Sequence, residues 1–434
     1  MKALADELNQ VLDSTIAGRL LSPLGRRLYF PKGIIAQAGE AKKAATTANA
    51  TIGMAYAGGK PLALSSVAGG FSGLLPEEAV VYAPTAGIEA ARAAWKDLLG
   101  AKNPSLDLER VSLPVVVPGL TGGISFMADL FLAEGDTLMA GGPCWDNYAF
   151  IAETRRGASF KEIPLFDDRE NPGGLALDSI SSALKGAGNT VKLILNFPNN
   201  PSGYSPTRGE AERLLASVKD AADAGADVLV LCDDAYFGFF YEKDCASQSL
   251  FAGLALLHER VLAVKIDGPT KEDYSWGLRT GFITFGSKGL TNEHYEALVK
   301  KLMGAIRSSV SCANTPAQHL MLKTLADSRS ASEKARFFSL LERRYRTVKQ
   351  CVAEHEPHPN LRSLPFNAGY FMTFQCRGVH AETLRKTLLE QEGIGTVSFG
   401  GSYLRVAFSS VDEALIPVVY RSIYRAAREL AGKT

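Results

Sequence analysis

The sequence predicts an α/β protein in which helices cover a mostly parallel sheet, followed by a smaller α+β domain. Apolar runs of strand length alternate with segments of helical periodicity over most of the chain before residue 314. After that point the pattern changes to long charged helices. The chain has 434 residues, of which 46% are hydrophobic, so it can bury a large core divided between two domains.

The expected elements follow this alternation in order. Strands are predicted at residues 111–117, 137–140, 159–163, 191–195, 227–232 and 260–266, and later at 370–376 and 403–408. Helices are predicted at residues 122–132, 207–224 and 331–354. The expected division is an N-terminal arm at 1–50, a large domain at 51–313 and a small domain at 314–434. Part of the N-terminal segment is expected to complete the small domain.

The composition excludes several classes of protein. The 47 Lys and Arg residues nearly balance 46 Asp and Glu residues, so no global field would attract nucleic acid or an anionic membrane. Six cysteines are scattered without a C-x-x-C pair, which predicts free thiols in a reducing compartment. Residues 1–8 carry acids where a signal peptide needs an apolar core, and no run reaches transmembrane length. A cytoplasmic location is therefore expected, with function confined to a local site.

A lysine and an arginine share the loop after the predicted strand at 260–266. Lys271 precedes Arg279, which has a glycine on either side. A lysine at the carboxyl edge of a buried sheet can have its pKa lowered by desolvation and neighbouring cations, as Schiff-base chemistry with an aldehyde cofactor requires. Arg279 could then hold the phosphate of that cofactor. Taken alone, a lysine and an arginine in a loop are more often solvated charges.

Four further groups follow predicted strands, where the ligands of open α/β sheets bind. The turn at 118–123 precedes a helix whose free amides and dipole favour phosphate, although many such segments are only tight turns. The loop at 196–203 would place an asparagine amide at the same edge, or be a simple turn. Asp233 and Tyr236 could bind a protonated ring nitrogen and a ring oxygen, whereas a strand-end acid can also be solvated or cap a helix. Trp145 could stack on a flat ring or be buried in the core.

Together these residues resemble the pyridoxal-phosphate aminotransferases of the aspartate aminotransferase fold type (class I/II), over about residues 50–410. The most specific signal is the order of three motifs: an N-x-x-N-N-P-x-G-like loop, a D-x-A-Y strand end and K-x-x-x-x-x-G-x-R-x-G. Residues 52–56 and 82–87 are similar to two further elements of that family. Residues 404–406 resemble the segment that holds its substrate-carboxylate arginine.

The resemblance implies an enzyme that moves an amino group from an L-amino acid to a 2-oxo acid, with 2-oxoglutarate as the expected acceptor. The cofactor would be pyridoxal 5'-phosphate, held as a Schiff base on Lys271, which would also shuttle the proton. The resemblance further implies that Asp233 pairs with the pyridine nitrogen. Tyr236 and Asn200 would bind the 3-oxygen of the ring, and Trp145 would stack on its face.

The remaining implied contacts hold the phosphate and the substrate. The residues implied for the phosphate are Thr121, Gly122, Gly123, Thr270 and Arg279. Arg405 is expected to bind the substrate α-carboxylate in a bidentate pair, with Gly53 also in the substrate site. The chain departs from the family pattern at Gly268, where a serine is common, at Gly123, where a hydroxyl residue is frequent, and at Tyr274, which often is glycine. These departures bear on phosphate affinity and not on the chemistry.

Two residues are implied to act across a two-fold interface. Tyr82 lies on an element that in similar enzymes reaches the partner's cofactor, which predicts a homodimer with shared sites and an N-terminal arm on the neighbour. Arg307 lies near the position at which dicarboxylate-specific relatives place an arginine for the distal carboxylate, although the loop after it is longer than the usual pattern. The alternative for Arg307 is an arginine that complements the dipole at a helix C-terminus.

Other functions were weighed against this one. A carbon–sulfur lyase or other elimination enzyme on the same fold would release pyruvate and ammonia without an acceptor. A ligand-sensing regulator built on an aminotransferase domain would need an added DNA-binding domain and a basic face, and the sequence offers neither. The His-Glu-Pro-His segment at 355–358 is interpreted as a solvated turn, so no metal is expected.

Overall fold

A seven-stranded sheet runs through the larger part of the protein. The computed structural model describes residues 2–30, 33–167 and 173–432, and the sheet is formed within them. The strands, in order across the sheet, are β4 (Val115–Val117), β10 (Gly281–Gly286), β9 (Val261–Asp267), β8 (Asp227–Asp233), β7 (Thr190–Asn196), β5 (Thr137–Gly142) and β6 (Ser159–Pro164). All run in one direction except β10, which is antiparallel to both of its neighbours. The predicted α/β class with a mostly parallel sheet is confirmed.

The register of the central strands brings polar residues to one edge of the sheet. Strands β8 and β9 are buried along nearly their whole length, as strands covered on both faces are, and this accounts for their continuous apolar sequences. Asn196, at the end of β7, pairs with Asp233, at the end of β8. Asp233 in turn pairs with Ile266 of β9. The loops that follow these strands therefore leave the sheet side by side.

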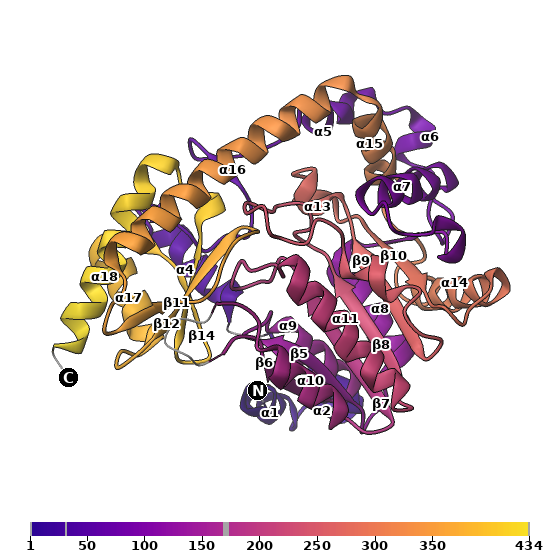
Figure 1. The fold of residues 1–434 in the computed structure, drawn as a ribbon, viewed down its shortest axis with the longest axis horizontal. Helices are drawn as coiled ribbons and strands as arrows, with labels where there is room; N and C mark the ends of the chain where they lie inside the picture. Colours follow the sequence, from indigo (N-terminus) through magenta and orange to yellow (C-terminus); the bar gives the residue numbers. More distant parts are fainter. Residues whose placement is uncertain (1, 31–32, 168–172, 433–434) are drawn as a thin grey trace.

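Helices cover both faces of the sheet (Figure 1). Helices α8 (Gly119–Phe131) and α14 (Asn292–Arg307) pack on one face, where α8 contacts β9 and β10. Helices α10 (Leu177–Lys185), α11 (Arg208–Asp223) and α12 (Leu250–Leu254) pack on the other. Helix α11 starts at a capping box in which Thr207 and Glu210 satisfy each other's backbone amides, so the predicted helix 207–224 includes its own cap. Helix α7 (Glu89–Lys102) lies at the β4 and β10 side.

A smaller antiparallel sheet forms the C-terminal part of the described residues. Its four strands, in order, are β11 (Leu361–Ser363), β12 (Phe371–Cys376), β15 (Tyr403–Ala407) and β14 (Val397–Phe399). Helices α17 (Ala381–Glu392) and α18 (Ile416–Ala431) pack with this sheet in one apolar cluster. The long helix α16 (Ser328–His355), orange in Figure 1, runs from α15 (Thr315–Ala326) to this end of the molecule. Strands β12 and β15 correspond to the predicted strands 370–376 and 403–408.

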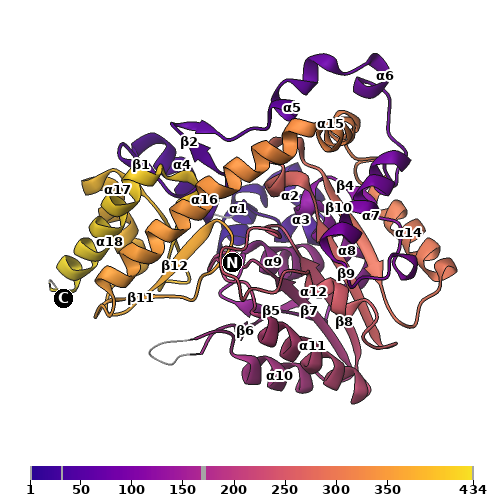
Figure 2. The ribbon, with the colours of Figure 1, turned by 45° about the horizontal axis from the view of Figure 1, so that its top comes forward.

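The N-terminal segment divides between the two sheets. Strand β1 (Ala48–Asn49) pairs in parallel with β13 (Ile394–Gly395), and α4 (Ile34–Ala44) packs beside α17 and β14 (Figure 2). The Gln37 side chain exchanges hydrogen bonds of 2.9 and 2.8 Å with the backbone of Ser398. This part of the segment therefore packs beside the smaller sheet, and β1 and β13 form a separate two-stranded sheet there.

The first three helices pack differently. Helix α3 (Pro23–Arg27) lies against η3 (Phe150–Arg155) of the same chain, where Arg27 Nε donates to the backbone oxygen of Thr154 at 3.0 Å. Helix α1 (Lys2–Leu12) packs on α3 and on α2 (Ile16–Leu20). Segment η3 supplies a backbone acceptor for Arg27 and an aromatic ring for Tyr29. The arm on a neighbouring subunit stays a prediction, because these contacts lie within a single chain.

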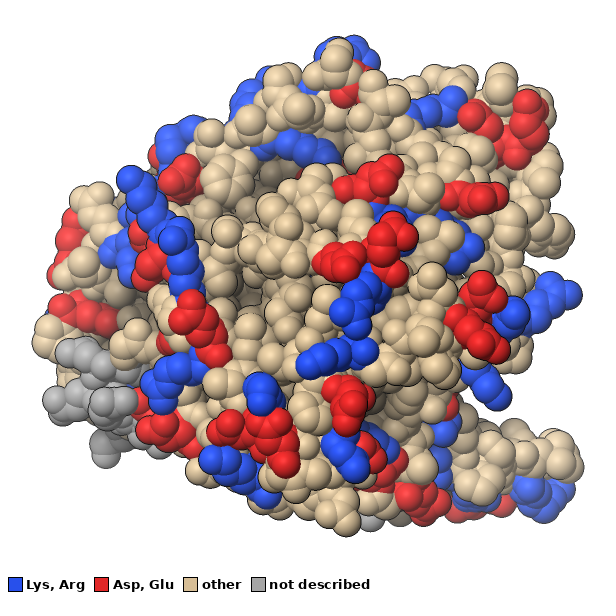
Figure 3. Space-filling model, turned by 45° about the vertical axis from the view of Figure 1, so that its right-hand side comes forward, with Lys and Arg blue, Asp and Glu red and all other residues tan. Residues whose placement is uncertain are grey.

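The surface carries both signs of charge without a large area of one sign on the face that Figure 3 shows. This distribution agrees with the formal net charge of +1. None of the helices formed by the described residues combines the length and the apolar sequence that crossing a bilayer needs. The site must therefore be sought in a local arrangement of side chains.

Candidate active site

A cavity of about 240 Å³ opens at the carboxyl ends of β7, β8 and β9, the edge at which ligands of open α/β sheets bind. The expected site residues that line it are Gly53, Thr121, Trp145, Asn200, Asp233, Tyr236, Thr270, Lys271 and Arg279. They come from segments far apart in the sequence, and the common edge of the sheet brings them together. Tyr148 and Asn196 also line the cavity and were not expected there.

Lys271 lies in the short helix α13 (Pro269–Glu272), which follows β9. Within the described residues its amine makes no hydrogen bond, and it lies 5.1 Å from the centre of the Tyr236 ring. Burial lowers the pKa of Lys271 to about 8, against the opposing charge of Asp233 and with a smaller contribution from the Arg279 cation. A neutral, nucleophilic amine is thus accessible near neutral pH, as expected from its position at the sheet edge.

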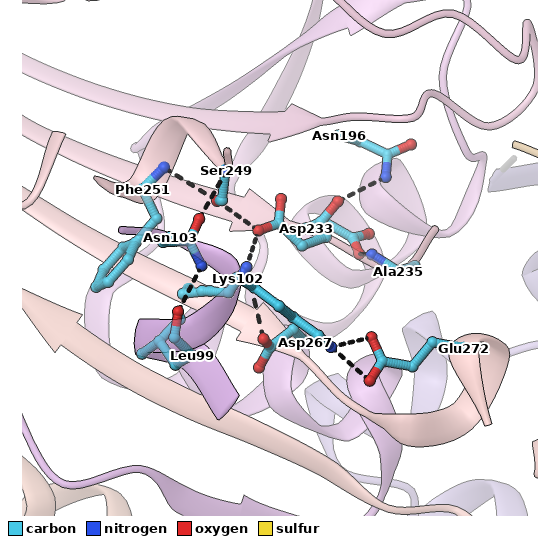
Figure 4. A network of polar contacts seen from close by, with 12 residues as sticks. Leu99, Lys102, Asn103, Asn196, Asp233, Ala235, Ser249, Phe251, Asp267 and Glu272 are labelled. Atoms are coloured by element: carbon cyan, nitrogen blue, oxygen red, sulfur yellow. Dashed lines mark hydrogen bonds and ion pairs between the residues drawn. The ribbon is translucent and has the colours of Figure 1, made fainter. Parts of the chain in front are cut away.

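Asp233 is 3% exposed and held by three donors. The Tyr148 hydroxyl donates to one carboxylate oxygen, and the Ala235 amide donates to the other at 3.3 Å. The Asn196 amide donates to the backbone oxygen of Asp233 at 2.8 Å (Figure 4). Burial raises the pKa of Asp233, while the Tyr148 hydrogen bond and the Lys271 charge lower it. The carboxylate is therefore fixed in position and in electrostatic contact with the lysine.

Arg405, on β15, is not among the residues that line the cavity, but it contacts Asn200, which does line it. Its Nη1 donates to Asn200 Oδ1 at 3.0 Å, and its Nη2 donates to the backbone oxygen of Thr51 at 3.0 Å. The guanidinium stands 4.5 Å over the Phe371 ring, and its buried Nε has no hydrogen-bond partner among the described residues. Burial lowers the pKa of Arg405, and the neighbouring Tyr236 opposes that shift. A buried guanidinium with an unused donor is suited to a carboxylate ligand.

The N-terminus of α8 differs from the expectation in register. The first three helical residues, Gly119, Leu120 and Thr121, have amides without an intrahelical acceptor, and Leu120 and Thr121 line the cavity. Gly122 and Gly123 lie deeper in the first turn, and a methyl group added at Gly123 would lie 3.1 Å from the Ile266 side chain. The free amides for an anion are therefore those of residues 119–121, and Gly123 serves the close packing of α8 on the sheet.

Arg279 lies against the same turn. Gly119 has a φ of +78°, and a methyl group added there would lie 2.6 Å from Arg279 Nη2. The guanidinium and the free amides of α8 thus surround one part of the cavity with positive charge, which favours a phosphate. Thr270 is less suited to the role implied for it, because its hydroxyl donates to the backbone oxygen of Thr280 at 3.0 Å. A hydroxyl has one hydrogen to donate, so Thr270 offers a phosphate no donor in this arrangement.

The other expected residues differ in how close they are to this centre. Trp145 packs edge-to-face on Tyr148, with ring centroids 5.4 Å apart, and lines the cavity. A methyl group at Gly53 would lie 3.4 Å from the Tyr236 hydroxyl, so glycine leaves room beside that phenol. Tyr82 is 87% exposed and Arg307 is exposed at the end of α14, so neither lines the cavity of this single chain.

Lys265 is the lysine nearest to Lys271 in the sequence, and its amine is paired with two carboxylates. Its amine pairs with Asp234 and, at 3.5 Å, with Asp267. Ser249 donates to Asp234 at 2.6 Å and Trp95 donates to Asp267 at 2.9 Å. Burial lowers the pKa of Lys265, but the two carboxylates outweigh burial and raise it above the ordinary value. Figure 4 shows Ser249 and Asp267 among the sticks gathered near Asp233.

The His-Glu-Pro-His segment lies outside the cavity. The ring of His355 stacks on Tyr424 with centroids 4.6 Å apart, and that of His358 packs on the same tyrosine at 5.2 Å. Both rings thus serve packing near α18. Among the described residues, no group of three or more His, Cys, Asp or Glu side chains is placed to hold a metal ion.

The cavity fits pyridoxal phosphate group by group. It offers an amine of low pKa, a buried carboxylate, an aromatic ring and a helix N-terminus with an arginine beside it. The buried Trp276 Nε1, in a residue that lines the cavity, has no hydrogen-bond partner among the described residues, as expected of a donor that awaits a ligand.

Comparisons with known proteins agree with this chemistry. The sequence model of aminotransferase class I and II matches residues 75–423. The chain is 23% identical to aromatic-amino-acid aminotransferase 2 of Thermococcus litoralis, over 77% of this chain and 81% of that one. It is also 23% identical to the aspartate aminotransferase of Pyrococcus horikoshii, over 78% and 81%. Relatives with different substrates are thus equally similar.

Solved structures show the same fold. An aminotransferase of Anaerococcus prevotii superposes with a TM-score of 0.80 at 24% identity, covering 93% of this chain and 98% of that one. The α-aminoadipate aminotransferase of Thermus thermophilus, solved with phosphopyridoxyl-leucine, superposes with a TM-score of 0.74 at 20% identity, covering 96% and 99%. The family match spans most of the sequence, and the cavity carries the groups that the cofactor of that family needs. The chain therefore belongs to the class I and II aminotransferases, pyridoxal-phosphate-dependent transaminases of fold type I.

Proposed function

We propose that this transaminase moves the amino group of an L-amino acid to 2-oxoglutarate, with Lys271 as the residue that binds the cofactor and carries the proton. The observation that supports this most is the amine of Lys271, whose pKa of about 8 is set within the same cavity as the buried Asp233. Bound pyridoxal phosphate supplies an electron sink for the carbanion that forms when the substrate Cα loses its proton. Lys271, once released, holds and returns that proton.

The residues around the lysine orient the cofactor. Asp233 binds the ring nitrogen and keeps it protonated, and the Tyr148 hydroxyl helps keep that carboxylate charged. Tyr236 and the free amide of Asn200 bind the ring oxygen, while Trp145 stacks on the ring. Arg279 and the amides of Leu120 and Thr121 would hold the phosphate, a role that the free helix N-terminus and the nearby guanidinium support.

The substrate is oriented by Arg405. Its Asn200 and Thr51 bonds fix the guanidinium, which leaves an unused donor for the α-carboxylate. Gly53 leaves space beside it for the substrate. Holding the carboxylate fixes which Cα bond stands perpendicular to the cofactor ring, and it favours loss of the proton over loss of the carboxylate. No observation favours the elimination enzyme over the transaminase.

The proposed reaction is tested by product analysis. Purified enzyme, 2-oxoglutarate and a panel of L-amino acids should yield glutamate and the matching 2-oxo acid in equal amounts. Pyruvate and ammonia from an amino acid without any acceptor would contradict the proposal and favour a lyase. The Lys271→Ala variant serves as the control that any observed transfer depends on this site.

A homodimer with shared sites is part of the proposal. Tyr82 follows a largely exposed segment, and large exposed apolar side chains precede it in the sequence. They are Phe71, Leu75, Val80 and Val81. Mixing Tyr82→Phe subunits with Lys271→Ala subunits should restore part of the activity if each site takes Tyr82 from the second copy. An active monomer in solution would contradict this arrangement.

Arg307 is proposed to bind the distal carboxylate of 2-oxoglutarate in the site of the second copy. Its exposure in the single chain leaves the guanidinium available for that contact. Arg307→Ala should raise the KM for 2-oxoglutarate by about tenfold or more and leave pyruvate and phenylpyruvate nearly unchanged. Equal effects on all acceptors would mean that Arg307 only complements the α14 dipole.

We also propose that the enzyme works in the cytoplasm. The support is chemical: all six cysteines lie in the described residues as free thiols, five of them buried, as is usual where the surroundings are reducing. Cell fractionation tests this location. Recovery of the protein from an oxidising compartment, with these thiols paired, would contradict it.

A further inference from the structure

A second cavity, of about 590 Å³, adjoins the first. Thr121 and Trp145 line both cavities, so the two meet at the indole ring expected to stack on the cofactor. The described walls of the second cavity come from two parts of the chain. The segment 145–150 forms one wall, and the N-terminal segment, with Leu4, Tyr29 and Ile35, forms the other. We call this cavity the N-terminal chamber.

Specific contacts hold the N-terminal segment over the chamber. Tyr29 packs edge-to-face on Phe150, with ring centroids 5.2 Å apart and planes at 88°. Arg27 donates to the backbone of Thr154 at 3.0 Å, and Asn9 joins α1 to α3 by donating to the Arg26 backbone oxygen at 3.0 Å. One wall of the chamber is thus formed by residues that are anchored to η3.

The chemistry of the walls is apolar with one acid. The side chains of Leu4, Tyr29, Ile35 and Phe150 offer carbon surface, and the described lining contains no lysine or arginine. Asp146 is the only charged side chain in that lining. Burial raises the pKa of Asp146, and the charge of Arg405 lowers it in part. A second carboxylate entering the chamber would meet an acid and no described cation.

We propose that the N-terminal chamber receives the side chain of the amino donor and selects large apolar or aromatic side chains over acidic ones. The inference rests on the proposed transamination at Lys271 and names the donor class of that same site. The donor's carboxylate would lie at Arg405, its amine at Lys271, and its side chain would pass Trp145 into the chamber. The distal carboxylate of 2-oxoglutarate has a separate proposed partner in Arg307, so the donor and acceptor assignments are tested apart.

The test compares one wall variant with a matched control. Wild-type enzyme should use L-phenylalanine with a kcat/KM about tenfold or more above that for L-alanine and L-aspartate. Tyr29→Ala should lower kcat/KM for L-phenylalanine about tenfold and change that for L-alanine by less than about twofold. Leu20→Ala, an exposed change in the same segment away from the chamber, should alter neither. Equal losses for both donors in Tyr29→Ala would overturn the proposal.

A gain of function sharpens the test. Ile35 is exposed and lines the chamber, so Ile35→Arg adds a cation to the wall without disturbing a packed core. This variant should raise kcat/KM for L-aspartate several-fold and lower it for L-phenylalanine. No change in the ratio of the two donors would contradict the chamber assignment.

A binding measurement separates failure of the chamber from failure of the proposed reaction. Calorimetric titration of the holoenzyme with 3-phenylpropionate, which has no amino group to transfer, should give a Kd that Tyr29→Ala weakens about tenfold. Titration with propionate should be unaffected. If no amino acid yields glutamate, the proposed reaction fails, and the titration still decides the chamber. If glutamate forms but Tyr29→Ala binds 3-phenylpropionate as the wild type does, only the chamber assignment fails.

Discussion

Lys265 and Lys271 lie on one strand and the turn that follows it, yet their environments are opposite. The Lys265 side chain is 1% exposed, pairs with Asp234 and Asp267, and has a raised pKa. Lys271 is also enclosed, but Asp233 acts on it without a hydrogen bond, and its pKa falls to about 8. Burial alone therefore does not make a lysine reactive. The difference lies in whether carboxylates are placed against the buried amine.

At this edge of the sheet, some acidic residues stabilise the fold and another faces the cavity. Asp234 and Asp267 pair with Lys265. Ser249 donates a hydrogen bond to Asp234, and Trp95 donates one to Asp267. Asp233, the neighbour of Asp234, turns to the other side of β8 and faces the cavity. Adjacent residues on a strand point to opposite faces, so one Asp-Asp pair supplies both the buried ion-pair network and the cofactor site.

The largest expected effect is on Lys271. Lys271→Ala should lower turnover by about 10⁴-fold or more, because both the covalent link to the cofactor and the proton carrier are lost. The thermal midpoint of the apoprotein should change little, since the amine makes no hydrogen bond within the described residues. Steady-state kinetics measures the loss of turnover, and differential scanning calorimetry measures the thermal midpoint. Strong destabilisation would show that Lys271 has a structural role like that of Lys265.

Lys265→Met should have the opposite profile. It leaves Asp234 and Asp267 buried without their cation, and breaking a buried pair in this way costs about 3–5 kcal/mol of unfolding free energy. Denaturant titration measures that loss, while kcat per folded molecule should stay within about tenfold. If Lys265→Met instead abolished turnover in a stable protein, the division of roles between the two lysines would be wrong.

Ser249→Ala should weaken the Lys265 network without breaking its ion pairs. The hydroxyl donates to Asp234 at 2.6 Å, and removing one donor to a buried charge costs about 1.5–3 kcal/mol. The denaturation midpoint should fall by less than in Lys265→Met, with unchanged turnover. A matched exposed change, Ser72→Ala, should leave the midpoint unaltered. Equal effects of Ser249→Ala and Lys265→Met would mean that the ion pairs add nothing.

The pKa difference predicts how capture of the cofactor depends on pH. Because the pKa of Lys271 is lowered to about 8, the neutral amine fraction of the apoprotein rises about tenfold per unit as the pH approaches 8 from below, then levels off. The rate at which apoprotein binds pyridoxal phosphate should follow that curve. Stopped-flow absorbance between pH 6 and 9.5 measures it. A rate still rising at pH 9.5 would indicate an amine of ordinary pKa.

The sequence predicted much of the fold because strands buried on both faces are continuous apolar runs, as β8 and β9 are. It did not predict β10 or its direction, since strand direction depends on contacts with β4 and β9. It also did not predict the contacts of Arg27 and Tyr29, which bind residues more than a hundred positions away. Local periodicity carries no information about such distant contacts.

The sequence predicted some residues of the cavity and not others, again because local patterns do not reveal distant contacts. Motif order identified residues at strand ends, and the register of the parallel strands then brings them together. Tyr148 was missed because its bond to Asp233 spans two separate segments, although it follows Trp145 closely in the sequence. The sequence did not show which amides at the start of α8 are free, because that start depends on the left-handed backbone at Gly119.

Lys271, and not Lys265, is proposed to hold the cofactor. Reducing the yellow holoenzyme with borohydride fixes pyridoxal phosphate covalently, and mass spectrometry of the peptides then locates it. We expect the phosphopyridoxyl group on Lys271, with Lys265 unmodified, because the Lys265 amine is paired with two carboxylates. A phosphopyridoxyl group on Lys265, or labelling of Lys271→Ala protein to the same extent as wild type, would contradict it.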